Sequence, residues 1–177
     1  MLDQHPLIAQ NFILGGSQGQ DQAQIPAARI CVFDADVRLQ DSLAQMLQQS
    51  GYTVIAGAYG EAAHAILRDG AFDLIVLNLE SSGGVAAHAL KSIRIVQPDV
   101  PLIVTAAHAS AESAIAAIKA NVVDYIVKPY EPSDLLLTIS KALEERAQQL
   151  RQQQLLSMVS QTLETLKQSR FTEPAVR

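Results

Sequence analysis

Between residues 29 and 147, short apolar runs alternate with segments of helical period, and this alternation constrains the fold more than any other feature. The runs are RICVF (29–33), TVIAGA (53–58), DLIVL (73–77), PLIVT (101–105) and DYIV (124–127). Between them, apolar residues recur every three or four positions in segments 36–51, 61–70, 85–96 and 110–121. Nearly continuous apolar strands separated by helices are typical of a parallel sheet covered on both faces. The sequence therefore predicts a doubly wound α/β domain with five parallel strands.

The composition fits such a domain and excludes several function classes. The chain has 177 residues, of which 49% are hydrophobic, and a formal net charge of −5. This charge argues against binding to nucleic acid, which usually leaves a basic surface. No stretch resembles a signal peptide or reaches the roughly 18–20 apolar residues of a membrane span. We therefore expect a soluble, cytoplasmic protein that contacts neither nucleic acid nor membrane.

The segments that flank the domain differ from it in pattern. Residues 1–28 are rich in Gln and show no sustained period, which predicts a flexible leader. A helical pattern begins at Ser133, and its first part, up to about residue 147, is predicted to be the last helix of the domain. The pattern continues through 148–170 as a helical extension, and residues 171–177 are predicted to be disordered. The extension carries an apolar stripe at Leu156, Val159, Leu163 and Leu166. We expect this stripe to pack against a partner, most simply a second copy, although a solvated helix or a linker is the alternative.

Polar residues follow the predicted strands at the edge where the crevice of such a sheet lies. Asp34, Ala35 and Asp36 follow the first run, and Asn78 follows the third with Glu80 two residues later. Thr105 and Ala106 stand at the end of the fourth run, and Lys128 follows the fifth. The function of the chain is therefore expected at this edge.

These segments resemble the receiver domain of bacterial two-component response regulators, most closely in DYIVKPYEPSDLL (124–137) and PLIVTAAHASAESAIAAIKAN (101–121). The resemblance covers about residues 29–147 and implies the flavodoxin-like strand order 2-1-3-4-5. In that family, two adjacent acids after the first strand hold Mg²⁺, and an Asp after the third strand accepts phosphate from a histidine kinase. A Ser or Thr after the fourth strand and a Lys after the fifth contact the phosphate, and an aromatic residue in the fifth strand changes rotamer.

Carried onto this chain, the resemblance places Asp34 at the first acid, but the second acid falls on Ala35 and the acceptor on Asn78. The hydroxyl position falls on Ala106, or on Thr105 if the alignment shifts by one residue. An amide oxygen has little nucleophilicity, and Mg²⁺ requires oxygen ligands, preferably carboxylates. Mg²⁺ binding is therefore expected to be weak or absent, no other cofactor is indicated, and neither a catalytic residue nor a metal ligand is assigned.

The remaining residues of this degenerate site suggest local roles. Lys128 is expected to pair with Asp34 or with Glu80, and in the second case Glu80 would partly replace the missing anion; a solvated Glu80 is the alternative. Asp36 is interpreted as the N-cap of the first helix. The aromatic position falls on Tyr125, for which we expect fixed packing rather than switching.

Three functions remain open on the sequence. The first is a receiver that is not phosphorylated, is not an enzyme and signals through protein contacts. Its expected surfaces are the C-terminal helix and the face formed by helix 110–121, strand 124–127 and the helix from residue 133. The second is a response regulator phosphorylated through a shifted Mg²⁺ site. The third is the receiver part of a transcription regulator whose output domain is absent from this chain.

Overall fold

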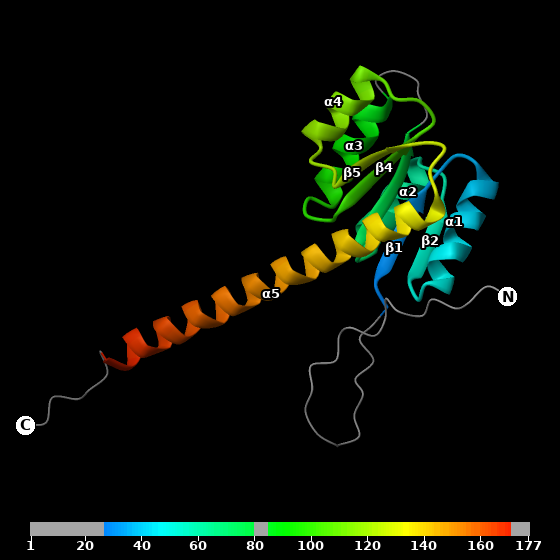
Figure 1. Ribbon diagram of the computed structural model, residues 1–177. Coiled ribbons are helices and arrows are strands. Elements are labelled where there is room, and N and C mark those ends of the chain that lie inside the picture. The colour runs from blue at the N-terminus through cyan, green and yellow to red at the C-terminus, as the bar shows by residue number, and fades with distance from the viewer. Residues whose placement is uncertain (1–26, 80–84, 171–177) are drawn as a thin grey trace, which may run out of the picture.

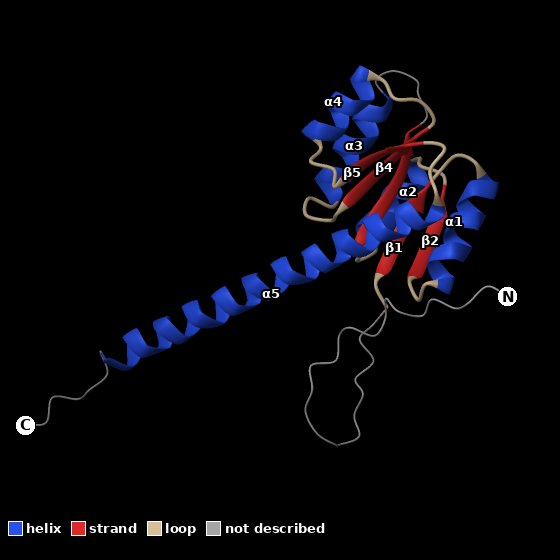
Figure 2. Cartoon of the chain, in the orientation of Figure 1, coloured by secondary structure: helices blue, strands red, loops and turns tan. Residues whose placement is uncertain are grey.

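The apolar runs form a single parallel sheet, and the segments of helical period form the helices around it (Figures 1 and 2). The computed structural model describes residues 27–79 and 85–170. The strands are β1 (Arg29–Phe33), β2 (Thr53–Gly57), β3 (Leu74–Leu79), β4 (Leu102–Ala106) and β5 (Asp124–Val127). The helices are α1 (Val37–Gln49), α2 (Glu61–Asp69), α3 (Val85–Val96), α4 (Ala111–Lys119) and α5 (Pro132–Arg170).

The strand order is β2-β1-β3-β4-β5, and every neighbouring pair is parallel, so the predicted fold class and order are confirmed. The direction in which strands are added reverses beside β1, because β2 lies on one side of β1 and β3 lies on the other. In sheets of this type, sites form at the carboxyl ends of the strands beside such a reversal. The register pairs Phe33 with Leu77 and Asn78 with Thr105, so the residues that follow these strands lie at one edge.

Strand β3 is longer than the sequence analysis predicts. The apolar run ends at Leu77, but the strand continues through Asn78 to Leu79, because β4 pairs with it up to Ala106. Asn78 is therefore held within the hydrogen-bonded sheet and does not stand in the loop after it. Its side chain is half-buried between the buried residues Leu77 and Leu79.

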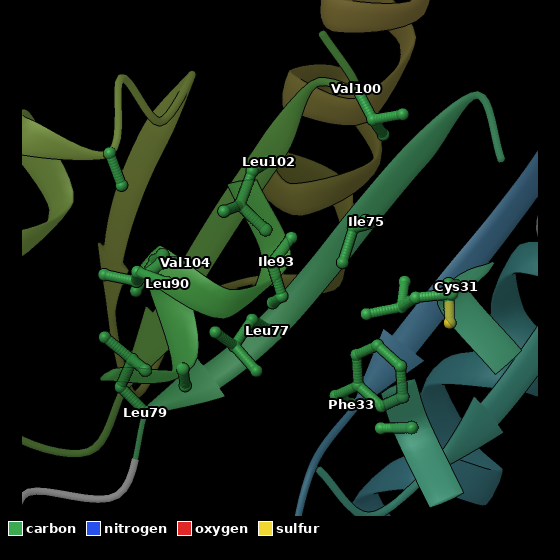
Figure 3. Close-up of a cluster of buried hydrophobic side chains, with 14 of the residues drawn as sticks. Cys31, Phe33, Ile75, Leu77, Leu79, Leu90, Ile93, Val100, Leu102 and Val104 are labelled. Carbon is green, nitrogen blue, oxygen red and sulfur yellow. The ribbon is translucent and has the colours of Figure 1, made fainter. Parts of the chain in front are cut away.

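Buried side chains on the two faces of the sheet form two separate clusters. Helices α2, α3 and α4 cover one face, where Leu67, Leu90 and Ile93 belong to the same buried cluster as Ile75 and Leu102. Figure 3 shows Leu90 and Ile93 of α3 among the side chains of the strands. Helices α1 and α5 cover the other face through Leu47, Leu135, Ile139 and Ala142. Cys31 is fully buried in the first cluster, and this burial raises the pKa of its thiol to about 12. Cys31 therefore packs as a small buried hydrophobic residue.

Two arginines tie helices to loops at the end of the sheet opposite the strand carboxyl ends. The Arg94 guanidinium, on α3, donates hydrogen bonds to the carbonyls of Val100, Ala120 and Asn121 at 2.6–3.0 Å. Arg146, on α5, donates to the carbonyl of Asp99 at 2.9 Å. Together these contacts fix the ends of α3 and α4 and the middle of α5 relative to the sheet.

Helix α5 runs for 39 residues without a break and extends far beyond the sheet (Figure 1). Range 148–170, in which the sequence analysis expects a helical extension, forms its distal part. The predicted leader and tail lie outside the described residues, except for the last two positions of the leader. None of the described helices combines the length and apolarity needed to cross a membrane.

Candidate functional site

Asp34 is the centre of a polar cluster at the carboxyl ends of β1, β3, β4 and β5. The residue follows β1 directly and is 6% exposed. Its Oδ1 atom accepts hydrogen bonds from the main-chain N–H of Asp36 at 3.0 Å and from the Asn78 side-chain amide at 2.8 Å. Its Oδ2 atom accepts from Lys128 Nζ at 3.0 Å. Hydrogen bonds to an ionised carboxylate are stronger than hydrogen bonds between neutral groups, so these partners offset the free-energy cost of burying the charge of Asp34.

Asn78 connects Asp34 to the neighbouring strand. Its Nδ2 donates to Asp34, and its Oδ1 accepts from Thr105 Oγ1 at 3.3 Å. A carboxylate at position 78 could not donate to Asp34, because an ionised carboxylate carries no proton. The amide therefore permits a contact between these two side chains that two carboxylates could not make.

The hydroxyl beside Asn78 belongs to Thr105, and the preference for Ala106 in the sequence analysis is wrong by one residue. Thr105 pairs directly with Asn78 in the sheet register, whereas Ala106 pairs with Leu79. Because side chains alternate between the faces of a strand, only one of two successive residues can point toward the cluster. The cluster thus retains a hydroxyl at Thr105, the alternative that the sequence analysis left open.

Lys128 reaches the cluster from the loop after β5. Its main-chain N–H donates to the carbonyl of Ala106 at 2.8 Å, and a cis peptide bond joins it to Pro129. The ammonium pairs with Asp34, one of the two partners that the sequence analysis expects. Glu80, the other expected partner, lies outside the described residues.

Asp36 and Ala35 contribute little side-chain chemistry to the cluster. The Asp36 carboxylate accepts hydrogen bonds from the main-chain N–H groups of Arg38 and Leu39, so it caps α1 as interpreted from the sequence.

Gln40 is a partner that the sequence analysis missed, since its Nε2 donates to the main-chain carbonyl of Asp34. The sequence gives only a weak signal for this contact, because the letters alone do not distinguish a buried Gln on a helix from an exposed one.

Tyr125 is held at a second point, next to α4. Its hydroxyl lies 2.8 Å from Ser113 Oγ, and it also donates to the carbonyl of His108 at 3.5 Å. The Ser113 hydroxyl in turn forms a capping box with Ser110 at the start of α4. The ring packs against the first hydrophobic cluster, so Tyr125 connects the sheet to the beginning of α4.

The donor set of this cluster does not fit the Mg²⁺ site that the family resemblance implies. Among the described residues, Asp34 is the one carboxylate that the cluster receives from a strand end, and both of its oxygens already accept hydrogen bonds. Asn78 turns its NH₂ group toward Asp34, and an NH₂ group cannot ligate a hard cation. Among the residues that the structure describes, no three His, Cys, Asp or Glu side chains are placed to hold a metal ion.

Comparison with protein families and curated proteins gives a consistent result. The model of the response regulator receiver domain matches residues 30–140. The transcriptional regulatory protein ZraR of Salmonella typhimurium is 33% identical over 114 residues, which are 64% of this chain and 26% of that protein. The alginate biosynthesis transcriptional regulatory protein AlgB of Pseudomonas aeruginosa is 30% identical over 118 residues, 67% of this chain and 26% of that protein. The chain thus matches about a quarter of the length of these relatives.

Solved structures agree with this result. The CheY-like receiver domain protein from Methanospirillum hungatei superposes with a TM-score of 0.65 at 27% identity, covering 70% of this chain and 98% of that one. The beryllofluoride-activated NtrC4 receiver domain dimer superposes with a TM-score of 0.59 at 29% identity, covering 67% and 98%. NtrX from Brucella abortus, in complex with ADP, gives a TM-score of 0.65 at 27% identity, covering 73% and 29%.

Proposed function

Because this chain belongs to the response regulator receiver family, we propose that it is a receiver that is not phosphorylated and that signals by binding other proteins. The observation that carries this proposal is the amide of Asn78, which donates to Asp34 and accepts from Thr105. By resemblance to the family, position 78 is the phosphate acceptor. An amide there supplies neither the nucleophile nor the metal ligand that acceptance of phosphate requires.

The contacts of the cluster also suggest that the domain stays in one state. Lys128 and Thr105, whose family counterparts contact the phosphate, are already paired with Asp34 and Asn78. The Tyr125 hydroxyl is paired with Ser113. These connected hydrogen bonds favour a single arrangement of the side chains that make them. In this proposal the protein is not an enzyme, and its output depends on which partners are present.

Intact mass spectrometry tests the first part of the proposal. The full chain would be incubated with acetyl phosphate and MgCl₂, and a phosphoryl group would add about 80 Da. We expect no gain for the natural chain and a Mg²⁺-dependent gain for the double variant Ala35→Asp/Asn78→Asp, which restores both carboxylates. A stoichiometric, Mg²⁺-dependent gain in the natural chain would instead establish phosphorylation through a shifted site.

The distal part of α5 provides the partner surface that we favour, and a second copy of this chain is the proposed partner. Leu156, Val159, Leu163 and Leu166 are each 53–67% exposed. At 3.6 residues per turn, this stripe is centred about 105° around the helix axis from the residues that face the sheet. A second helix could therefore pack on the stripe without meeting the domain from which α5 emerges. The NtrC4 receiver in the comparison above is likewise a dimer.

Light scattering after size-exclusion chromatography tests this partner. We expect the full chain to be a dimer and a chain ending at residue 148 to be a monomer. Leu163→Glu should also give a monomer, because it places a charge within the apolar stripe. The α4–β5–α5 face is the alternative surface, and Ile118→Glu tests it, since Ile118 is 77% exposed on α4. A dimer that survives truncation but is lost with Ile118→Glu would assign the interface to that face.

A second candidate function follows from the relatives. ZraR and AlgB are both named transcriptional regulatory proteins, and this chain matches about a quarter of each. In this alternative, α5 would connect the receiver to an output domain in a longer, cytoplasmic protein. Mapping the transcript that encodes the chain would test it, because an open reading frame that continues beyond Arg177 would favour the alternative.

A further inference from the structure

A hollow opens beside the Asp34–Lys128 ion pair, between α1 and the segment that joins β5 to α5. Its volume is about 280 Å³. Its lining comes from Asp34, from one face of α1 and from residues 128–132. The hollow is therefore formed by two separate segments of the chain, and the polar cluster closes one end of it.

The walls of the hollow are mostly apolar. Leu39, Leu43 and Met46 come from successive turns of α1, while Pro129 and Pro132 face them from the other segment. Leu39 is 44% exposed, and Leu43 and Met46 are half-buried against the second hydrophobic cluster. Apolar walls with a few polar groups at one end are typical of sites for small molecules.

The polar groups offer both hydrogen-bond donors and acceptors. An ammonium has three N–H donors, and Lys128 uses one of them on Asp34. Asp34 Oδ2 accepts from Lys128 and has capacity for one more donor. Within the described part of the chain, the hydroxyls of Ser42 and Tyr130 make no hydrogen bond. Burial, and after it the Asp34 carboxylate, raises the pKa of Tyr130, so its hydroxyl remains a donor at neutral pH.

The charges at this end cancel, which limits the ligands that the hollow can take. An anionic group near Lys128 would also face Asp34, and a cationic group near Asp34 would also face Lys128, because the two side chains are 3.0 Å apart. Like charges at such distances are unfavourable in a partly buried site. A neutral group that both donates and accepts hydrogen bonds avoids this conflict and can bind to both members of the pair.

We propose that this hollow binds a small, uncharged molecule with one ring and a carboxamide-like group, the ring lying between α1 and the prolines and the polar group on the ion pair. The volume would hold roughly nine water molecules at about 30 Å³ each, which corresponds to a ligand with about nine non-hydrogen atoms. This site goes beyond the proposed function, because it requires neither phosphorylation nor a second copy of the chain.

Three probes of equal size and different charge test the proposal. Benzamide is neutral and both donates and accepts, benzoate is an anion that only accepts, and benzamidinium is a cation that only donates. Each would be titrated into the isotope-labelled full chain, with NMR shifts followed at Leu39, Leu43 and Met46. We expect saturable shifts with benzamide at millimolar concentration and roughly tenfold weaker binding of the two charged probes. Equal affinities for all three, or no saturable shift at these residues, would overturn the proposal.

Two matched variants of α1 locate the binding. Ser42 and Gln45 are both exposed on this helix, but only Ser42 lines the hollow. Ser42→Phe should fill the mouth and abolish the benzamide shifts, while Gln45→Phe should leave them unchanged. A well-dispersed spectrum for both variants would show that each is folded. Unchanged binding in Ser42→Phe would refute the site, whereas a phosphoryl gain in the mass experiment would affect only the proposed function.

Discussion

The substitution Asn78→Asp is expected to destabilise the domain, although it restores the acid that the receiver family carries at this position. It removes the hydrogen bond from the Asn78 amide to Asp34, which spans 2.8 Å, and it places a second carboxylate beside the first. A hydrogen bond to a charged group contributes about 1.5–3 kcal/mol. Two charges about 4 Å apart repel by up to about 4 kcal/mol at an effective dielectric constant near 20.

The ammonium of Lys128, 3.0 Å from Asp34, offsets part of that repulsion. We therefore expect the free energy of unfolding to fall by about 2–4 kcal/mol, a large part of the roughly 5–15 kcal/mol typical of a domain. Urea unfolding at pH 7.5, followed by circular dichroism without divalent cations, would measure this loss. Millimolar MgCl₂ should return part of it, because a cation that binds only the folded state stabilises that state.

The natural chain is the matched control for the measurement with MgCl₂. Its free energy of unfolding should not change on adding MgCl₂, because Asn78 offers an NH₂ group to Asp34 and not a carboxylate. Asn78→Ala separates the two contributions, since it removes the hydrogen bond without adding charge. An Asn78→Asp chain as stable as the natural one would refute the reasoning. So would a loss of equal size in Asn78→Asp and Asn78→Ala, because the added charge would then have no effect.

Further substitutions and treatments at Cys31, Arg94 and Asp36 have expected outcomes. Cys31, whose pKa burial raises to about 12, should resist Ellman's reagent at pH 8 and react at once in urea. Above about pH 9 the Cys31 thiol ionises in the unfolded chain but stays protonated in the fold, so the free energy of unfolding should fall as the pH rises. Unfolding of the natural chain at pH 8 and pH 10 measures this fall, and Cys31→Ala, which has no thiol, is the control. Arg94→Ala should lower the free energy of unfolding by about 2–4 kcal/mol, because buried carbonyls lose their donors, and Arg94→Lys should restore little of it. Asp36→Ala should cost about 1 kcal/mol through the lost cap of α1, as thermal unfolding would show.

The order of elements and the place of the site could be predicted from the sequence because they depend on local patterns. Apolar runs such as RICVF (29–33), separated by segments of helical period, are typical of strands in a parallel sheet covered on both faces, and right-handed crossovers then place the strand ends at one edge. Asp34 and Lys128 follow two such runs directly, so their proximity follows from the topology. Asp36 is likewise a local prediction, since its cap involves only its near neighbours.

The details that depend on pairing between strands could not be predicted in this way. Whether Thr105 or Ala106 faces Asn78 is decided by the register of β4 against β3, and a shift of one residue reverses the answer. The hydrogen bond from Gln40 to Asp34 depends on how α1 lies on the sheet. The hollow between Leu43 and Tyr130 depends on the packing of two distant segments, for which the sequence carries no periodic signal.

The length of α5 gives the molecule a mechanical property that the domain alone would lack. From Arg146, whose guanidinium holds the helix to the carbonyl of Asp99, the helix spans about 36 Å to Arg170 at about 1.5 Å per residue. If α5 tilted as a rigid rod about this point, a tilt of about 10° would move Arg170 by about 6 Å. Such a displacement is about the rise of one helical turn, so the position of a partner bound near Arg170 would depend on how firmly α5 is held at Arg146.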